Sequence, residues 1–194
     1  SKVHQFGFSA FGPCLYFMQR LLAQYWEPLY PLIPADDPEG VDYRVNLIRW
    51  LNKLTPVIAQ LPITLTRSEV MYSWSDWEMA ARYEQLTAKQ QKELGEEMIQ
   101  SSSVVTAIIA TPIEFYQQTL TYIQLSIEAI ESFTTLADDK FGNKSPSLSE
   151  VHTLLNNINE MLYSHVQNRF TAEDIDEPED VSGQPENQGN TAKT

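Results

Sequence analysis

The three histidines are the residues best suited to acid–base or metal chemistry, and they lie far apart in the sequence. His4, His152 and His165 each lack a second histidine, a cysteine or a carboxylate at the spacing that places two metal ligands on one face of a helix. Glu150 stands two residues from His152, and on a helix that spacing puts the two side chains on different faces. The sequence therefore predicts no metal site.

Cys14 is the only cysteine, which excludes an internal disulfide and is compatible with a reducing compartment. It follows Pro13 in an apolar run, so we interpret it as a small buried residue and not as a nucleophile. Paired acids at 96–97 and 138–139 fall in polar stretches, where a solvated surface explains them. We predict no catalytic residue and no cofactor, and therefore not an enzyme.

Charge narrows the possible partners. The net charge is −13, and residues 171–194 hold seven acids and one lysine. No basic stripe offers the phosphate contacts that nucleic acids require, and anionic membranes would repel the chain. No stretch approaches the roughly 20 apolar residues of a spanning helix, so we expect no direct membrane insertion. A cytoplasmic protein is the expectation.

Apolar residues that recur every three or four positions predict helices in the first half of the chain, at about 5–25, 42–60, 75–86 and 88–102. The first is expected to bend, or to divide, at Gly12 and Pro13. The second, with Asp42 as N-cap, is expected to kink or end at Pro56, and its broad stripe includes Leu47 and Trp50. Residues 62–73 are predicted to be extended, and the apolar patch at 104–110 must be covered by another element.

Three predicted helix starts rest on hydroxyl caps followed by an acidic residue. They are Ser75 with Glu78, Thr111 with Glu114, and Ser147 with Glu150. The second opens a long helix that ends at Gly142, and the third opens a partner helix that runs to about Phe170. A short loop between two long helices predicts an antiparallel hairpin.

These elements together predict an all-α fold: a multi-helix, orthogonal or bundle-like domain with a long C-terminal antiparallel hairpin and a disordered acidic tail. We divide the chain into a helical region at 1–102, a hairpin at 103–170 packed on it, and a linker at 171–194 that is too polar to bury a core. There is no initiator Met, so we expect the first region to begin before Ser1.

The segment 24–42 joins the first two helices and is rich in aromatic and proline residues. Its four prolines exclude a continuous helix, because each removes a backbone donor and disfavours the α region before it. We interpret Trp26 and Tyr30 as structural residues that lock the first helix against the second, in preference to stacking on a ligand. Arg44 and Arg49 could pair with acids of this segment.

The same segment resembles the ImpA-type N-terminal domain of TssA-like proteins of the bacterial type VI secretion system. In that family a helix ends in an aromatic-Trp-acidic-x-x-aromatic-Pro element, followed by an acidic spacer and an Arg-x-Asn-x-x-x-x-Leu helix. The signature positions here are Tyr25, Trp26, Glu27, Tyr30, Pro31, Asp36, Asp37, Arg44, Asn46 and Leu51. The runs at 7–22, 62–66 and 73–80 fit the family too, so the resemblance covers about half of the chain.

The resemblance implies a non-enzymatic adaptor that helps to assemble the contractile tail on the baseplate and membrane complex. It implies partners among other type VI components, such as the tail tube or sheath, and a homo-oligomeric parent protein that assembles through a domain outside this fragment. The alternative is a small-ligand or peptide-binding sensor, for which four tryptophans would supply a pocket. As the partner-binding edge we predict Leu32, Ile33, Asp36, Asp37 and Glu39, with the acids steering a basic surface.

Overall fold

The structure, a computed structural model, describes residues 7–33, 39–65, 71–94 and 98–170. Over these residues the chain is helical, and its strand-like pairing is limited to an isolated antiparallel bridge between Pro62 and Ser73. The predicted all-α fold is confirmed. The tail at 171–194, predicted to be disordered, lies outside the described residues.

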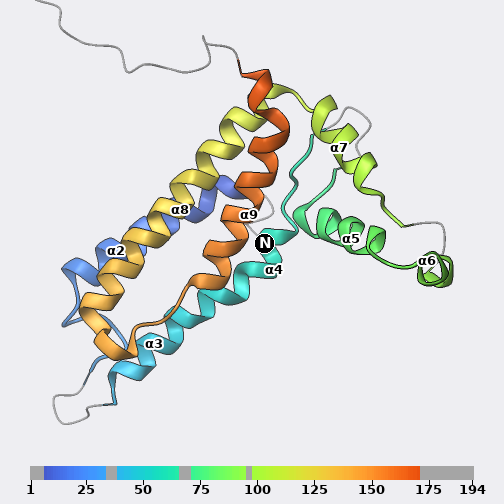
Figure 1. The fold of residues 1–194 in the computed structure, drawn as a ribbon. Helices are drawn as coiled ribbons and strands as arrows, with labels where there is room; N and C mark the ends of the chain where they lie inside the picture. The colour runs from blue at the N-terminus through green and yellow to red at the C-terminus, as the bar shows by residue number, and fades with distance from the viewer. Residues whose placement is uncertain (1–6, 34–38, 66–70, 95–97, 171–194) are drawn as a thin grey trace, which may run out of the picture.

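Helix α8 (Ile113–Phe141) is the centre of the molecule, because α2 (Phe11–Gln24) and α9 (Ser149–Val166) both pack along it (Figure 1). A 3-10 turn, η1 (Gly7–Ala10), leads into α2 and also contacts α8. Helix α8 ends at Gly142, as predicted, where φ is +54°. A positive φ favours glycine because it has no Cβ. The short turn η3 (Gly142–Lys144) then leads towards α9.

Two faces of α8 are buried, whereas the periodicity indicated one apolar seam. The predicted seam residues Ile123, Ile127 and Ile130 are buried, but so are the small residues Ser126 and Ala129. The second face meets α2 at Gly12, where an added Cβ would lie 3.2 Å from the Ser126 Oγ. Small residues thus allow α2 to approach α8 closely, a contact that apolar periodicity alone does not reveal.

The predicted helix 42–60 is divided into α3 (Val41–Arg49), the 3-10 segment η2 (Trp50–Leu54) and α4 (Thr55–Ala59). Pro56 lies in the first turn of α4, where a backbone N–H would have no partner within the helix, so the proline is tolerated there. The helix is therefore interrupted before Pro56 and not at it. Asp42 was predicted as the N-cap, but Gly40 takes that position, and the Asp42 carboxylate pairs with the Lys144 Nζ at 3.0 Å.

The broad apolar stripe of this segment was predicted to be buried, and on one side of the helix that prediction is wrong. Val45, Ile48 and Leu51 are buried, whereas Leu47 is 59% and Trp50 is 54% exposed. No element of the described chain covers these two side chains.

Helices α5 (Trp74–Glu84), α6 (Ala88–Leu94) and α7 (Ser101–Ala110) extend to one side of the bundle (Figure 1). The N-cap of α5 is Ser73, not Ser75: its hydroxyl accepts from the backbone amide of Asp76, whose carboxylate accepts from the Ser73 amide. The predicted capping box is therefore right in kind but two residues late in position. The apolar patch at 104–110 is itself a helix, which the sequence analysis missed.

The other two predicted hydroxyl caps are wrong. The Thr111 hydroxyl is used elsewhere, because it donates to the Ala107 carbonyl at 2.8 Å and accepts from the Leu65 amide at 2.9 Å. Pro112 stands at the N-cap of α8 instead. Leu148 stands at the N-cap of α9, and the Ser147 hydroxyl contacts the Ser149 hydroxyl. Helix α9 ends at Val166 and is followed by η4 (Gln167–Arg169).

One core joins the predicted regions 1–102 and 103–170. Buried residues of α2, α3 and α4 belong to the same cluster as those of α8 and α9. The boundary near residue 102 remains a prediction.

Tyr116 ties the extended segment after α4 to the core, and it generates a testable pH dependence. Its side chain is fully buried, and its hydroxyl donates to the Ile63 carbonyl at 3.1 Å. Burial raises the pKa of Tyr116 from 10.0 to about 12, although the Thr111 hydroxyl and the Arg169 charge oppose the shift. Above about pH 10 the unfolded chain releases this proton while the native protein holds it, so stability falls as the pH rises towards about 12.

We expect this group to cost about 2–3 kcal/mol of unfolding free energy across that window. Urea unfolding of the wild type and of Tyr116→Phe at about pH 9 and about pH 11.5 measures it. The substitution is expected to reduce the alkaline loss of stability, while Tyr163→Phe, at an exposed position on α9, leaves it unchanged. Parallel pH profiles for Tyr116→Phe and the wild type would contradict the assignment.

Candidate functional site

Arg44 is buried at the junction of the segment 24–42 and α3, with 3% of its surface exposed. Its Nε donates to the Pro31 carbonyl at 2.8 Å, one terminal nitrogen donates to the Trp26 carbonyl at 2.6 Å, and the other donates to the Leu29 carbonyl. The planar guanidinium presents five donors in a fixed geometry, which suits three converging acceptors. We call residues 25–33 and Arg44 the Arg44 corner. The Tyr30–Pro31 peptide bond in it is cis.

Trp26 connects this corner to the central helix. The Arg44 Cζ lies 4.7 Å from the centre of the Trp26 ring, and the Phe141 ring meets the same indole edge to face, 5.1 Å between centres. The Lys140 Nζ lies 5.8 Å from the indole centre. Trp26 therefore packs against α3 and α8, whereas the prediction had it join the first two helices. Tyr30, which was expected to share that role, is 83% exposed.

The charge of Arg44 is held in an environment that disfavours it. Burial lowers the pKa of the Arg44 guanidinium, and the nearby Glu27 carboxylate partly opposes the shift. Arg44 is thus a buried residue that bonds to backbone carbonyls, whereas the sequence suggested a role in an exposed ion pair. Arg49 lies at the other end of α3, exposed, with a long contact of 3.4 Å to the Asn46 Oδ1.

The other predicted residues are divided between core and surface. Leu51 is buried, whereas Tyr25 and Asn46 are exposed. In the predicted docking edge, Leu32 is 59% exposed, Ile33 is half-buried and Glu39 is exposed. Asp36 and Asp37 lie outside the described residues.

A groove of about 190 Å³ lies between α2 and α3, beside the corner. Met18, Leu21 and Leu22 form one wall, and Leu47 and Ile48 form the other. Leu29, Tyr30 and Arg44 complete the lining. The sequence analysis did not find this groove, because it assigned Leu47 to the core.

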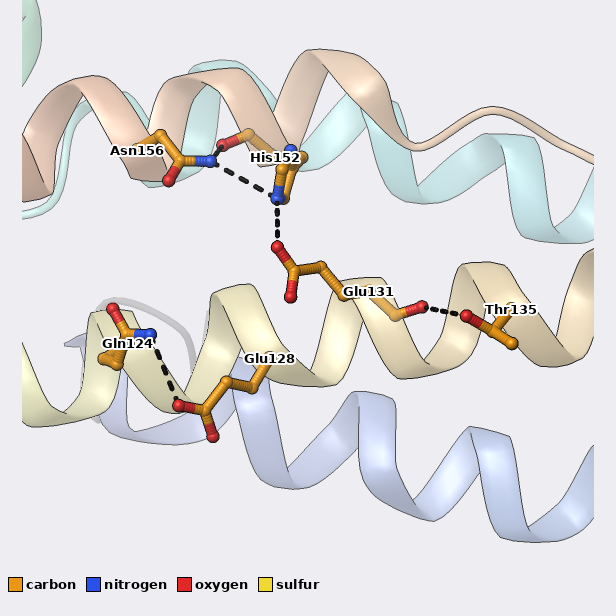
Figure 2. Close-up of polar contacts among 6 residues, drawn as sticks. All are labelled: Gln124, Glu128, Glu131, Thr135, His152 and Asn156. Carbon is orange, nitrogen blue, oxygen red and sulfur yellow. Dashed lines mark hydrogen bonds and ion pairs between the residues drawn. The ribbon is translucent and has the colours of Figure 1, made fainter.

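Among the described residues considered for catalysis, His152 is in contact with a carboxylate. The His152 Nε2 lies 3.3 Å from the Glu131 Oε1 of α8, and Asn156 contacts the same nitrogen (Figure 2). Spacing along the chain could not reveal this pair, because Glu131 lies 21 residues away on another helix. Among the described residues there is no group of three or more His, Cys, Asp or Glu that could hold a metal ion.

Two other residues considered for chemistry, His165 and Cys14, lie on α9 and α2. His165 packs edge to face with Trp77, and His4 lies outside the described residues. Cys14 is exposed, which corrects the predicted burial: it lies on the solvent side of α2, whose inner face carries Leu15 and Leu22. No helix in the described part of the chain combines the length and apolar character that a bilayer crossing needs.

The geometry of Arg44 predicts that lysine cannot replace it. A lysine ammonium is a point charge without the guanidinium fork, so Arg44→Lys should leave at least one corner carbonyl without its donor. Buried unsatisfied polar groups cost about 1–3 kcal/mol each, and we expect a loss of about 2–4 kcal/mol in unfolding free energy, measured by urea denaturation. Arg49→Lys, at an exposed position on the same helix, is expected to change stability by less than about 0.5 kcal/mol. Equal stabilities of the two variants would contradict the role given to Arg44.

Comparison with known proteins shows what the segment that contains this corner is similar to. Residues 1–53 match the family described as ImpA, N-terminal, type VI secretion system. No curated protein matches the chain significantly. A solved structure, the N-terminal domain including the conserved ImpA_N region of the TssA component of the type VI secretion system from Burkholderia cenocepacia, superposes with a TM-score of 0.72 at 17% identity.

That match covers 84% of this chain and 65% of the solved one, so the chain spans about two thirds of the length of that structure. The two findings confirm the resemblance predicted from the sequence. The chain therefore carries an ImpA-type N-terminal region in residues 1–53 and has a TssA-like helical fold.

Proposed function

We propose that this chain is part of a TssA-like component of a bacterial type VI secretion system and acts as a non-enzymatic assembly adaptor. The observation that carries the proposal is the match of residues 1–53 to the ImpA N-terminal family, since that segment contains the whole Arg44 corner. The helical fold shared with the TssA N-terminal domain supports it. The adaptor helps to assemble the contractile tail on the baseplate and membrane complex, in the cytoplasm.

Its partners are other type VI components of the baseplate, the tail tube or sheath, and the membrane complex. In the proposal, the secretion component is homo-oligomeric. An adaptor of this kind needs a rigid surface that partners can recognise, and the Arg44 corner is such a surface. Three charge-assisted hydrogen bonds hold its backbone, so little conformational entropy is left to lose on docking.

The first two residues of the predicted docking edge, Leu32 and Ile33, belong to this corner. Leu32 offers an exposed apolar side chain, and Ile33 next to it is half-buried. Apolar anchors of this kind contribute most of the binding energy at interfaces, while charged rim residues mainly set the association rate. In the proposal, Asp36, Asp37 and Glu39 form the acidic rim and steer a basic partner surface.

A small-ligand sensor is not favoured, because the four tryptophans do not gather around one pocket. Trp26 packs on Phe141, and Trp77 packs on His165. Trp74 is buried, and Trp50 is largely exposed. None of the four lines the groove between α2 and α3.

The experiment that tests the function is copurification of the parent protein from its own cells, followed by identification of the bound proteins. Type VI components should be enriched with the wild type. If they are absent under conditions in which the system assembles, the adaptor function is wrong.

Kinetics with a partner identified in this way tests the docking edge. Asp36→Lys with Asp37→Lys is expected to slow association and flatten its salt dependence, because it removes the steering charge. Leu32→Ala with Ile33→Ala is expected to speed dissociation about tenfold or more, through loss of anchors. Glu114→Lys with Glu160→Lys, at exposed acids on α8 and α9, serves as the charge control. Wild-type rates in both edge variants would place the docking surface elsewhere.

A further inference from the structure

A pocket of about 440 Å³ lies beside the first half of α8, at the end of that helix opposite the Arg44 corner. One wall is a single face of α8, which carries Phe115, Gln118, Thr119 and Tyr122 at helical spacings. The turn η1 and the extended segment 62–65 contribute to the other walls. The volume falls in the range of roughly 300–1,000 Å³ that is typical of small-ligand sites.

Thr119 is buried at this pocket, with 7% of its surface exposed. Two other threonines of α8, Thr121 and Thr135, donate to the carbonyl four residues earlier, at 2.7 Å and 3.0 Å. The Thr119 hydroxyl has no hydrogen-bond partner within the described part of the chain. Buried polar groups without a partner are costly and uncommon, so this hydroxyl points to a molecule that supplies the partner from the pocket.

Gln118 and Tyr122 bring two further neutral polar groups to the same face of α8. Their side chains also have no hydrogen-bond partner among the described residues. A carboxamide offers both donors and an acceptor, and each hydroxyl can donate and accept. Next to them the pocket is lined by the rings of Phe8 and Phe115. The pocket therefore combines an apolar surface with a row of neutral hydrogen-bonding groups.

None of the described residues that line the pocket is charged. Glu114 precedes Phe115 in sequence, but it is exposed and does not belong to the lining. An ionised ligand would find no opposite charge here, and moving an unpaired ion out of water is costly. A pure hydrocarbon would leave the Thr119 hydroxyl without a partner. The lining thus favours a neutral ligand that has both an apolar part and a hydrogen-bonding group.

From these observations we infer that the pocket binds a neutral amide that carries an aromatic or branched aliphatic substituent. The substituent packs against Phe8 and Phe115, and the amide forms hydrogen bonds with Gln118 and Thr119. Such an amide belongs to a free small molecule or to an uncharged stretch of polypeptide. The inference goes beyond the adaptor function and does not depend on it, because the Arg44 corner lies at the other end of α8 and none of the four tryptophans lines this pocket.

Three matched compounds test the preference for a neutral ligand on the 194-residue chain. At about pH 6, N-acetyl-phenylalanine methylamide is neutral, N-acetyl-phenylalanine carries a carboxylate, and phenylalanine methylamide carries an ammonium group. In two-dimensional NMR titrations we expect the neutral compound to bind at least tenfold more tightly than either ion. Its amide shifts should be concentrated on η1, residues 62–65 and the first half of α8. Equal affinities, shifts elsewhere, or no shift with any compound at millimolar concentration would overturn the inference.

Thr119→Val removes the hydroxyl and keeps the shape of the side chain. It is expected to weaken binding of the neutral compound about fivefold, through loss of one hydrogen bond. The thermal midpoint should stay equal or rise, because the hydroxyl has no protein partner to lose. Thr121→Val is the matched control: its position is exposed and its hydroxyl bonds to the Gln117 carbonyl, so the affinity should not change. Unchanged affinity or a lowered thermal midpoint in Thr119→Val would contradict the assignment.

A longer neutral compound, acetyl-Gly-Phe-Gly methylamide, distinguishes the two sources of the amide. Binding at least as tight as that of the short compound indicates a polypeptide segment, whereas weaker binding indicates a free small molecule. The same NMR samples show whether the chain fills its own pocket. Nuclear Overhauser contacts from residues 1–6 or 66–70 to the Thr119 side chain in the free protein would overturn the inference.

Discussion

The hydrogen bonds from Arg44 to three backbone carbonyls are the interaction on which this structure depends. Prolines between α2 and α3 remove backbone donors, so the carbonyls of Trp26, Leu29 and Pro31 need a partner from elsewhere. A buried guanidinium supplies that partner, and its charge is offset by the indole ring and by Glu27. One side chain thereby fixes α3 relative to the end of α2, and through Trp26 and Phe141 relative to α8.

The same interaction explains why apolar side chains can remain exposed at this place. Arg44 holds the backbone on both sides of Tyr30 and, with Leu47, forms part of the groove lining. The groove therefore keeps its shape without an occupant. Binding to a preformed surface of this kind requires little reorganisation. The His152–Glu131 pair is a single side-chain contact, and Cys14 is a single exposed residue, so neither matches the set of contacts that Arg44 makes.

Much of the fold could be predicted from local patterns, and the failures have a common cause. Gly142 ends α8 as expected, because a positive φ is a local requirement. Thr111 looked like an N-cap, but a tertiary contact to Leu65 uses its hydroxyl, and spacing in sequence cannot reveal such a partner. Leu47 fitted the apolar period of α3 and was assigned to the core. Periodicity identifies apolar faces, but it does not show whether another element covers them.

Protection of the Arg44 side-chain Nε–H from hydrogen exchange, observed by ¹⁵N NMR, tests the central claim most directly. A guanidinium that is buried and bonded to Pro31 should exchange this proton far more slowly than an exposed arginine such as Arg49 in the same protein. The rate should approach that set by opening of the α2–α3 junction. If the Arg44 and Arg49 protons exchange equally fast, Arg44 does not hold the corner and this account of the fold is wrong.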